Sequence, residues 1–212
     1  MDSKRKSISL TKNLRISMER NSDKPSKLYK LAYSISVIGH PLITISVFVL
    51  IYGYLFYDVK TTLSVFLLIL LVVILPIAIN NYWQASKGMI TNFDVSDRKQ
   101  RSSLYPYLLL LMAVITGVLY YFKYPESITI GVSCFLLMIL FMSVLNFKLK
   151  ASLHAASSFF ICMLILKVSP TVGVCALVFS LVVAWSRLVL KRHTLPEIIA
   201  GSASGILFGL LG

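Results

Sequence analysis

Residues 170–197 read PTVGVCALVFSLVVAWSRLVLKRHTLPE, an apolar run that ends in a short cluster of charged and polar side chains. The run from Pro170 to Leu190 can cross about 30 Å of hydrocarbon, which takes about 20 helical residues. Other apolar runs of this kind recur along the chain, and 57% of its 212 residues are hydrophobic while only 14% are charged. These features predict an integral membrane protein built from helices, because the strands of a membrane barrel would alternate polar and apolar residues.

Seven apolar runs are candidate membrane spans. The Ser169-Pro170 pair separates two of them, because the residue before a proline is biased away from the helix. Pro196 is expected in the first turn of the last helix, where its missing N–H costs little. We therefore predict an all-α, polytopic transmembrane bundle over residues 36–212, with six spans and a shallow last helix as the alternative to seven. The runs cover residues 36–57, 61–81, 104–122, 126–147, 152–169, 170–190 and 196–212.

The first 35 residues form a separate basic tail with nine lysines and arginines. No apolar h-region follows these charges, so the tail is not a secretory signal. With seven spans, eighteen of the 21 lysines and arginines lie on the same side as the tail, and only Lys60, Lys123 and Lys167 lie opposite. The positive-inside rule then predicts a cytoplasmic N-terminus. Topology thus accounts for the net charge of +13, and we expect membrane lipid rather than nucleic acid as the partner.

Three polar clusters are not explained by the apolar pattern. Two predicted spans separate each cluster from the next, so all three are expected at one end of the bundle. The first cluster, residues 92–106, contains Arg98, Lys99 and Arg101; the second, residues 148–154, contains Ser152 and His154; the third, residues 186–197, contains Ser186, Arg187, His193 and Glu197.

These groups suit the chemistry of phosphoryl transfer. Guanidinium groups stabilise the charge that spreads over phosphate oxygens. A neutral imidazole can attack phosphorus, and a second imidazole can protonate the leaving oxygen. Glu197 stands four residues after His193, so on a helix its carboxylate would share a face with that ring and could orient it. This chemistry needs no metal or other cofactor, and the three cysteines lack the paired spacing of a metal site.

The three clusters resemble the motifs of the type 2 phosphatidic acid phosphatase (PAP2) superfamily. The family's third motif is Ser-Arg, five residues, His, three residues, Asp, and it is matched at Ser186, Arg187 and His193, with Glu197 in place of Asp. Its second motif, Pro-Ser-Gly-His, is matched in part by Ser152 and His154. Its first, Lys, six residues, Arg-Pro, is matched least. Arg101 takes the arginine position there, while Asp94 and Ser102 replace the lysine and the proline.

The resemblance implies a metal-independent phosphatase of a bacterial cell membrane that acts on an amphiphilic phosphorylated substrate. His193 would be the nucleophile that forms a phosphohistidine, Glu197 its orienting acid, and His154 the general acid. The phosphate would be held by Arg187, Ser152, Ser186 and Arg101, with Arg98 or Lys99 replacing the missing lysine.

Two other functions stay open. A PAP2-like chain that has lost activity would keep the bundle for binding or scaffolding. Asp94 and Asp97 are similar to the aspartates of intramembrane prenyltransferases of the UbiA type, which bind diphosphate through Mg²⁺. That function needs a second Asp-rich loop, and the chain has none.

Several residues are assigned structural roles. Lys148, Lys150, Lys191 and Arg192 are expected to serve topology. The His40-Pro41 pair is expected to mark a helix start or kink, and the small residues from Gly201 to Gly205 to allow close helix packing.

Overall fold

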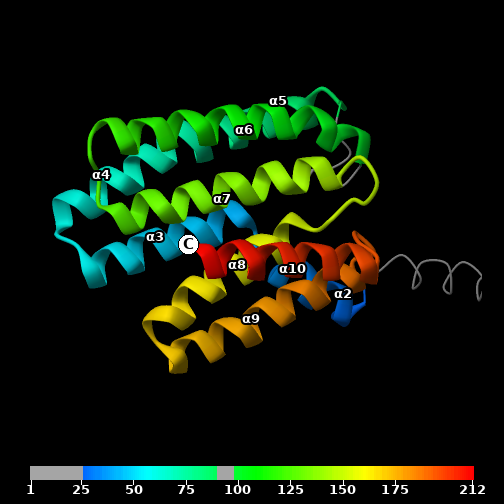
Figure 1. Cartoon of the computed structure of the whole chain (residues 1–212). Coiled ribbons are helices and arrows are strands. Elements are labelled where there is room, and N and C mark those ends of the chain that lie inside the picture. The colour runs from blue at the N-terminus through cyan, green and yellow to red at the C-terminus, as the bar shows by residue number, and fades with distance from the viewer. Residues whose placement is uncertain (1–25, 90–97) are drawn as a thin grey trace, which may run out of the picture.

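The computed structural model describes residues 26–89 and 98–212, with only the backbone given for residues 98–100. Every regular element within these ranges is helical, which confirms the all-α prediction (Figure 1). The elements are α2 (Lys27–Ile38), α3 (Pro41–Phe56), α4 (Val59–Ile69), the π-helical turn η1 (Leu70–Ile74), α5 (Leu75–Ser86), α6 (Arg98–Tyr121), α7 (Glu126–Leu145), α8 (Leu153–Val168), α9 (Pro170–Val189) and α10 (Leu195–Leu211).

Successive long helices run in opposite directions, so their connections alternate between two ends of the bundle (Figure 1). One end carries the starts of α3, α6, α8 and α10 together with the C-terminal ends of α5, α7 and α9. We call it the polar end, because it carries the second and third polar clusters and the part of the first that the structure describes. The connections α3–α4, α6–α7 and α8–α9 lie at the opposite end.

Four helical segments of the described chain are long and apolar enough to cross a membrane: Val59–Ser86, Arg101–Tyr121, Glu126–Leu145 and Pro170–Val189. A fifth span is possible if α2 and α3, which meet at a bend of 50°, act as one broken segment. The runs predicted as spans at 152–169 and 196–212 form α8 and α10, which are apolar but have only 16 and 17 residues. The long helices agree with a membrane protein.

The predicted tail overlaps the first described helix. Ser26 caps α2 by accepting a hydrogen bond from the Tyr29 N–H at 3.1 Å. Helix α2 packs along α9 and buries Ala32 and Ser36. Residues 27–35, predicted to belong to the tail, are therefore part of the packed bundle, while residues 1–25 lie outside the described chain.

Prolines and a histidine begin helices where the sequence predicted. His40 is the N-cap of α3 and Pro41 its first residue, and the bend between α2 and α3 lies there. Ser169 ends α8 and precedes Pro170, the first residue of α9. Pro196 lies in the first turn of α10. Each proline thus occupies a position in the first turn of a helix, where a backbone N–H would have no acceptor within the helix.

Helices α8 and α10 pack backbone to backbone through three glycines spaced four residues apart. A Cβ at Gly201 would lie 2.5 Å from the carbonyl oxygen of Ser152, and one at Gly209 would lie 2.8 Å from that of Phe160. A Cβ at Gly205 would come closer still to the carbonyl oxygen of Ala156. Small residues at this spacing allow two helix axes to approach closely. The predicted packing role of the segment is confirmed, and the contact fixes the start of α8 against the start of α10.

Candidate functional site

One guanidinium group connects the three polar clusters. Arg101, in the first turns of α6, donates from Nη1 to the backbone oxygen of Ala151 at 2.7 Å. Its Nη2 lies 3.2 Å from Nε2 of His193. The side chain of Arg101 is almost fully buried, at 1% exposure. The predicted meeting of the clusters at one end of the bundle is thus observed.

The turn after α9 sets the position of His193 relative to Arg187. The Arg192 N–H donates to the Arg187 oxygen at 3.0 Å, and the Lys191 N–H donates to the Leu188 oxygen at 2.9 Å. These two bonds, with Lys191 at φ 53°, form a Schellman motif, in which a left-handed residue closes the end of a helix. Backbone hydrogen bonds therefore hold the His193 ring next to the end of α9.

The ring of His193 is held in one tautomer. Its Nδ1 lies 3.0 Å from Oε2 of Glu197 and 3.2 Å from the backbone oxygen of Lys150. Both neighbours are acceptors, so Nδ1 carries the hydrogen and Nε2 keeps its lone pair in the neutral ring. That lone pair faces the Arg101 guanidinium, which donates to it.

The surroundings of His193 keep it neutral. Burial lowers its pKa to about 2, and the charges of Arg101, Arg187 and Lys150 act in the same direction. These effects outweigh the contact with Glu197, which by itself would favour the charged ring. A neutral imidazole with an unprotonated Nε2 is the form that acts as a nucleophile.

Glu197 has two roles. As the third residue of α10 it completes a capping box with Thr194, whose backbone N–H donates to Oε2 at 3.1 Å. The same oxygen lies against Nδ1 of His193. The predicted sharing of a face by His193 and Glu197 is observed, but it depends on the cap of α10 as much as on the four-residue spacing.

Lys150 is a site residue that the sequence analysis assigned to topology. Its Nζ donates to the backbone oxygen of Arg192 at 3.0 Å and lies 3.9 Å from Oε2 of Glu197. Its backbone oxygen also contacts His193. A signal was present in the sequence, because Lys150 stands two residues before Ser152 in the second cluster.

Ser152 and His154 lie at the start of α8. Ser152 is fully buried and caps the helix, with Oγ accepting from the Ala155 N–H at 3.4 Å. Its N–H donates to the backbone oxygen of Glu197 at 3.0 Å, which joins α8 to α10. His154 is buried, and its Nε2 has no hydrogen-bond partner among the described residues.

His40 lies next to His154, a contact that its place outside the three motifs did not suggest. The two ring centroids are 5.1 Å apart at an interplanar angle of 89°. His40 accepts the Leu42 N–H at Nδ1, at 3.2 Å, as the cap of α3. In the neutral ring the proton of His40 therefore lies on Nε2.

The remaining predicted residues differ in their placement. Arg187 is fully buried and donates from Nη1 to the Ser36 hydroxyl of α2. The hydroxyl of Ser186 donates to the Val183 oxygen at 2.6 Å, within its own helix, so it is not directed at the other site residues. Arg98 begins α6, but its side chain and that of Lys99 lie outside the described part of the chain, as do Asp94 and Asp97.

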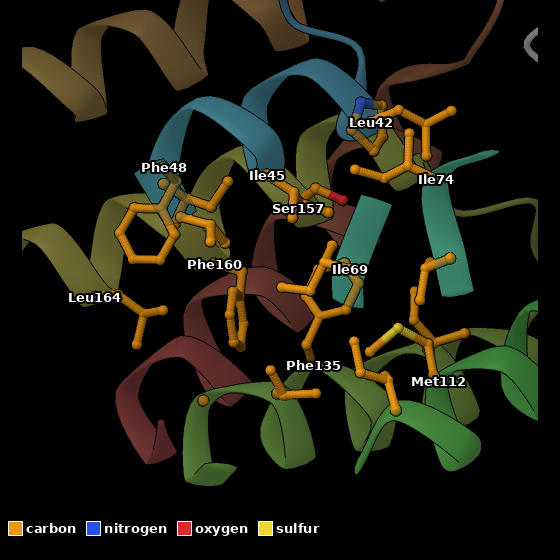
Figure 2. Close-up of a pocket in the computed structure, with 18 of the residues that line it drawn as sticks. Leu42, Ile45, Phe48, Ile69, Ile74, Met112, Phe135, Ser157, Phe160 and Leu164 are labelled. Carbon is orange, nitrogen blue, oxygen red and sulfur yellow. The ribbon is translucent and has the colours of Figure 1, made fainter. Parts of the chain in front are cut away.

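A narrow cavity extends from the polar end into the bundle between α3, the α4–η1–α5 segment, α6, α7 and α8. It has a volume of about 250 Å³. Its wall is mainly apolar, with Ile69, Met112, Phe135 and Phe160 pointing inward (Figure 2). At the polar end of the bundle, the cavity is lined by His40, Asn81, Arg101, His154 and Ser157. An apolar space therefore opens directly beside Arg101 and His154.

Comparisons with known proteins add no assignment to this geometry. No family model, curated protein or solved structure matches the chain. Within the residues that the structure describes, no group of three or more His, Cys, Asp or Glu side chains is arranged to hold a metal ion.

Proposed function

We propose that this chain is a PAP2-type membrane phosphatase that hydrolyses a lipid phosphate or an isoprenoid diphosphate through a phosphohistidine. The observation that carries the proposal is the environment of His193. Its Nδ1–H is directed at Glu197 and the Lys150 oxygen, and its Nε2 lone pair faces the guanidinium of Arg101. An orienting carboxylate on one side of the ring and a cation on the other suit attack on phosphorus.

The reaction has two steps. Nε2 of His193 attacks phosphorus, the bond from phosphorus to the leaving oxygen breaks, and His154 delivers a proton to that oxygen. Water then gives a proton to His154 and attacks phosphorus, and the P–N bond breaks to release phosphate and restore both rings. Glu197 stabilises the positive charge that His193 carries in the intermediate.

Arg101 and Arg187 supply the positive charge for the phosphate. Both guanidinium groups are buried, at 1% and 0% exposure, so their interaction with a phosphate oxygen is only weakly screened by water. Substrate binding moves the Arg101 Nη2 bond from His193 to phosphate, which frees the Nε2 lone pair at the moment when phosphorus arrives.

The bundle would lie in a bacterial cell membrane with six or seven spans and the N-terminus in the cytoplasm. Support comes from the long apolar helices and from the lysines and arginines gathered toward one end. The short helices α8 and α10 would then line the site, with the polar end at the membrane surface.

A second candidate function follows from the contact between Arg101 and His193. The Arg101 guanidinium donates to the Nε2 lone pair that the attack requires. If this bond persists with a ligand present, the chain binds a lipid phosphate without turning it over, as a PAP2-like binding or scaffold protein.

The test is phosphate release by the purified protein from a panel of lipid phosphates and isoprenoid diphosphates in EDTA. We expect turnover that His193→Ala abolishes and His154→Ala slows, with an acid-labile phosphoprotein trapped in the His154→Ala variant. Lys191→Gln, which changes an exposed neighbour in the same turn, is the matched control and should retain activity. Binding without turnover supports the scaffold function, and strict Mg²⁺ dependence or prenyl transfer would support the UbiA-like one.

A further inference from the structure

The cavity beside the site is long and narrow, and polar side chains line it at the polar end of the bundle. Two buried polar atoms that line this end, His154 Nε2 and Ser157 Oγ, have no hydrogen-bond partner among the described residues. Both side chains are at most 3% exposed. Buried polar groups are seldom left unpaired in a finished structure, so these atoms point to a ligand whose polar head lies next to them.

The shape of the cavity restricts the rest of that ligand. Residues of α8 line it from Leu153 to Val168, a rise of about 22 Å at about 1.5 Å per residue. Its volume of about 250 Å³ lies just below the range of about 300–1,000 Å³ that is typical of small-molecule pockets. A space this long and this small favours one hydrocarbon chain over the two acyl chains of a glycerolipid.

We propose that the cavity binds the single hydrocarbon chain of an isoprenoid phosphate, and that Gly131 sets the length of chain that it accepts. The reaction at the phosphate rests on the proposed function, whereas the binding of the hydrocarbon chain rests on the cavity alone. The phosphate lies at Arg101 and His154, and the hydrocarbon chain runs away from them past Phe135 and Phe160, whose rings contact each other edge to face, toward the opposite end of the bundle.

Gly131 is in the second turn of α7, near the end opposite the site, and it lines the cavity. A Cβ added there would meet no atom within 4 Å. A larger side chain at this position therefore extends into space that the hydrocarbon chain of the ligand would occupy. Gly117 of α6 also has nothing within 4 Å of an added Cβ, but it is exposed and does not line the cavity. The two glycines form a matched pair for the same substitution.

The experiment compares wild type, Gly131→Leu and Gly117→Leu on geranyl, farnesyl and geranylgeranyl phosphates and on dioleoyl phosphatidic acid, all in one detergent. We expect wild type to prefer single-chain substrates to phosphatidic acid by about tenfold or more in kcat/KM. Gly131→Leu should lower kcat/KM for the longest chain by about tenfold and leave the shortest within about twofold. A few carbon atoms in a hydrophobic pocket typically change rates by this much. Gly117→Leu should match wild type on every substrate.

A wild-type preference for phosphatidic acid, or an equal loss on all chain lengths in Gly131→Leu, would overturn the inference. If Gly131→Leu does not fold, Gly131→Ala makes the same comparison with a smaller side chain. If wild type releases no phosphate at all, the proposed function fails and the cavity is tested alone, by crosslinking a farnesyl phosphate that carries a diazirine on its chain. Labels on α7 and α8 that weaken in Gly131→Leu support the cavity site, and labels only on outward-facing residues exclude it.

Discussion

The guanidinium of Arg101 lies 3.2 Å from Nε2 of His193, although 92 positions separate the two residues in the chain. The contact means that a buried cation engages the lone pair of the proposed nucleophilic atom. An arriving phosphate competes with a histidine for Arg101, and an anion is the stronger acceptor for a guanidinium. Binding of substrate and exposure of the nucleophile are therefore one event in the proposed mechanism.

Glu197 should show separable structural and catalytic roles. Glu197→Gln keeps an oxygen that can accept the Thr194 N–H, but it removes the charge that stabilises a phosphorylated His193. We expect kcat to fall by about 100-fold or more, because orienting carboxylates of this kind contribute at least that much. The thermal midpoint should change little. Glu197→Ala should lose the same activity and also about 1 kcal/mol of stability, the typical cost of a lost helix cap. Equal kcat in Glu197→Gln and wild type would remove Glu197 from the mechanism.

The neutral state of His193 predicts a pH dependence of stability. The folded pKa is lowered to about 2, whereas an unfolded histidine titrates at about 6.5. Between these values the unfolded chain binds a proton that the folded chain does not. Stability is therefore fully present above about pH 6.5 and falls as the pH decreases, by about 1.4 kcal/mol per pH unit from this residue.

The measurement is the thermal midpoint in detergent from pH 7.5 to pH 4.5, for wild type and for His193→Gln. The variant should lose part of the decline, because Gln cannot take up the proton. Parallel curves for the two proteins would show that His193 is not held neutral.

The glycines between α8 and α10 should tolerate no side chain. A Cβ at Gly201 would lie 2.5 Å from the Ser152 oxygen, so Gly201→Ala must push α10 away from the start of α8. We expect a lower thermal midpoint and a loss of activity, since Ser152 is bonded to the backbone of Glu197. Gly117→Ala, where the added Cβ meets nothing within 4 Å, should be neutral or slightly stabilising. A normal midpoint and activity in Gly201→Ala would contradict the close packing of α8 and α10.

The helices and the meeting of the clusters were predictable because they depend on patterns along the chain. One sequence shows the apolar runs, the prolines and the even number of predicted spans between successive clusters. The prolines predicted helix starts at or next to those observed at Pro41, Pro170 and Leu195. The four-residue spacing of His193 and Glu197 also predicted their contact, although His193 precedes the N-cap of α10 and the capping box shares in positioning Glu197.

Other features depend on packing and had no local pattern. Lys150 enters the site by donating from Nζ to the backbone oxygen of Arg192 and by accepting from Nδ1 of His193 at its own backbone oxygen. Ser36 reaches Arg187 only because α2 lies along α9. His40 meets His154 only because α3 and α8 pack side by side. A contact made between elements far apart in the chain leaves no periodic trace in either one, so Ser36 and His40 required the structure. Lys150 had a signal only in its place within the second cluster.

The left-handed turn at Lys191 should be improved by glycine. Lys191 has φ 53°, a conformation that costs a residue with a side chain about 1 kcal/mol and costs glycine almost nothing. Lys191→Gly should therefore leave activity unchanged and keep or slightly raise the thermal midpoint, even though glycine adds freedom to the unfolded chain. Lys191→Val should lower the midpoint, since a β-branched residue is strained there. A drop in turnover for Lys191→Gly with folding intact would instead assign its ammonium group a role in the site.

The charge distribution predicts which side of the membrane holds the site. Ser103 is exposed on α6 near the polar end, and Lys60 is exposed in the first turn of α4 at the other end. In a background with Cys134, Cys162 and Cys175 replaced, we expect an impermeant maleimide added to intact cells to label Lys60→Cys and not Ser103→Cys. Permeabilised cells should label both, which controls for the reactivity of each thiol. The reverse pattern would place the site on the outer face. Charge bias alone would place the basic residues of the polar end in the cytoplasm, so in that case these residues would be retained because they bind phosphate.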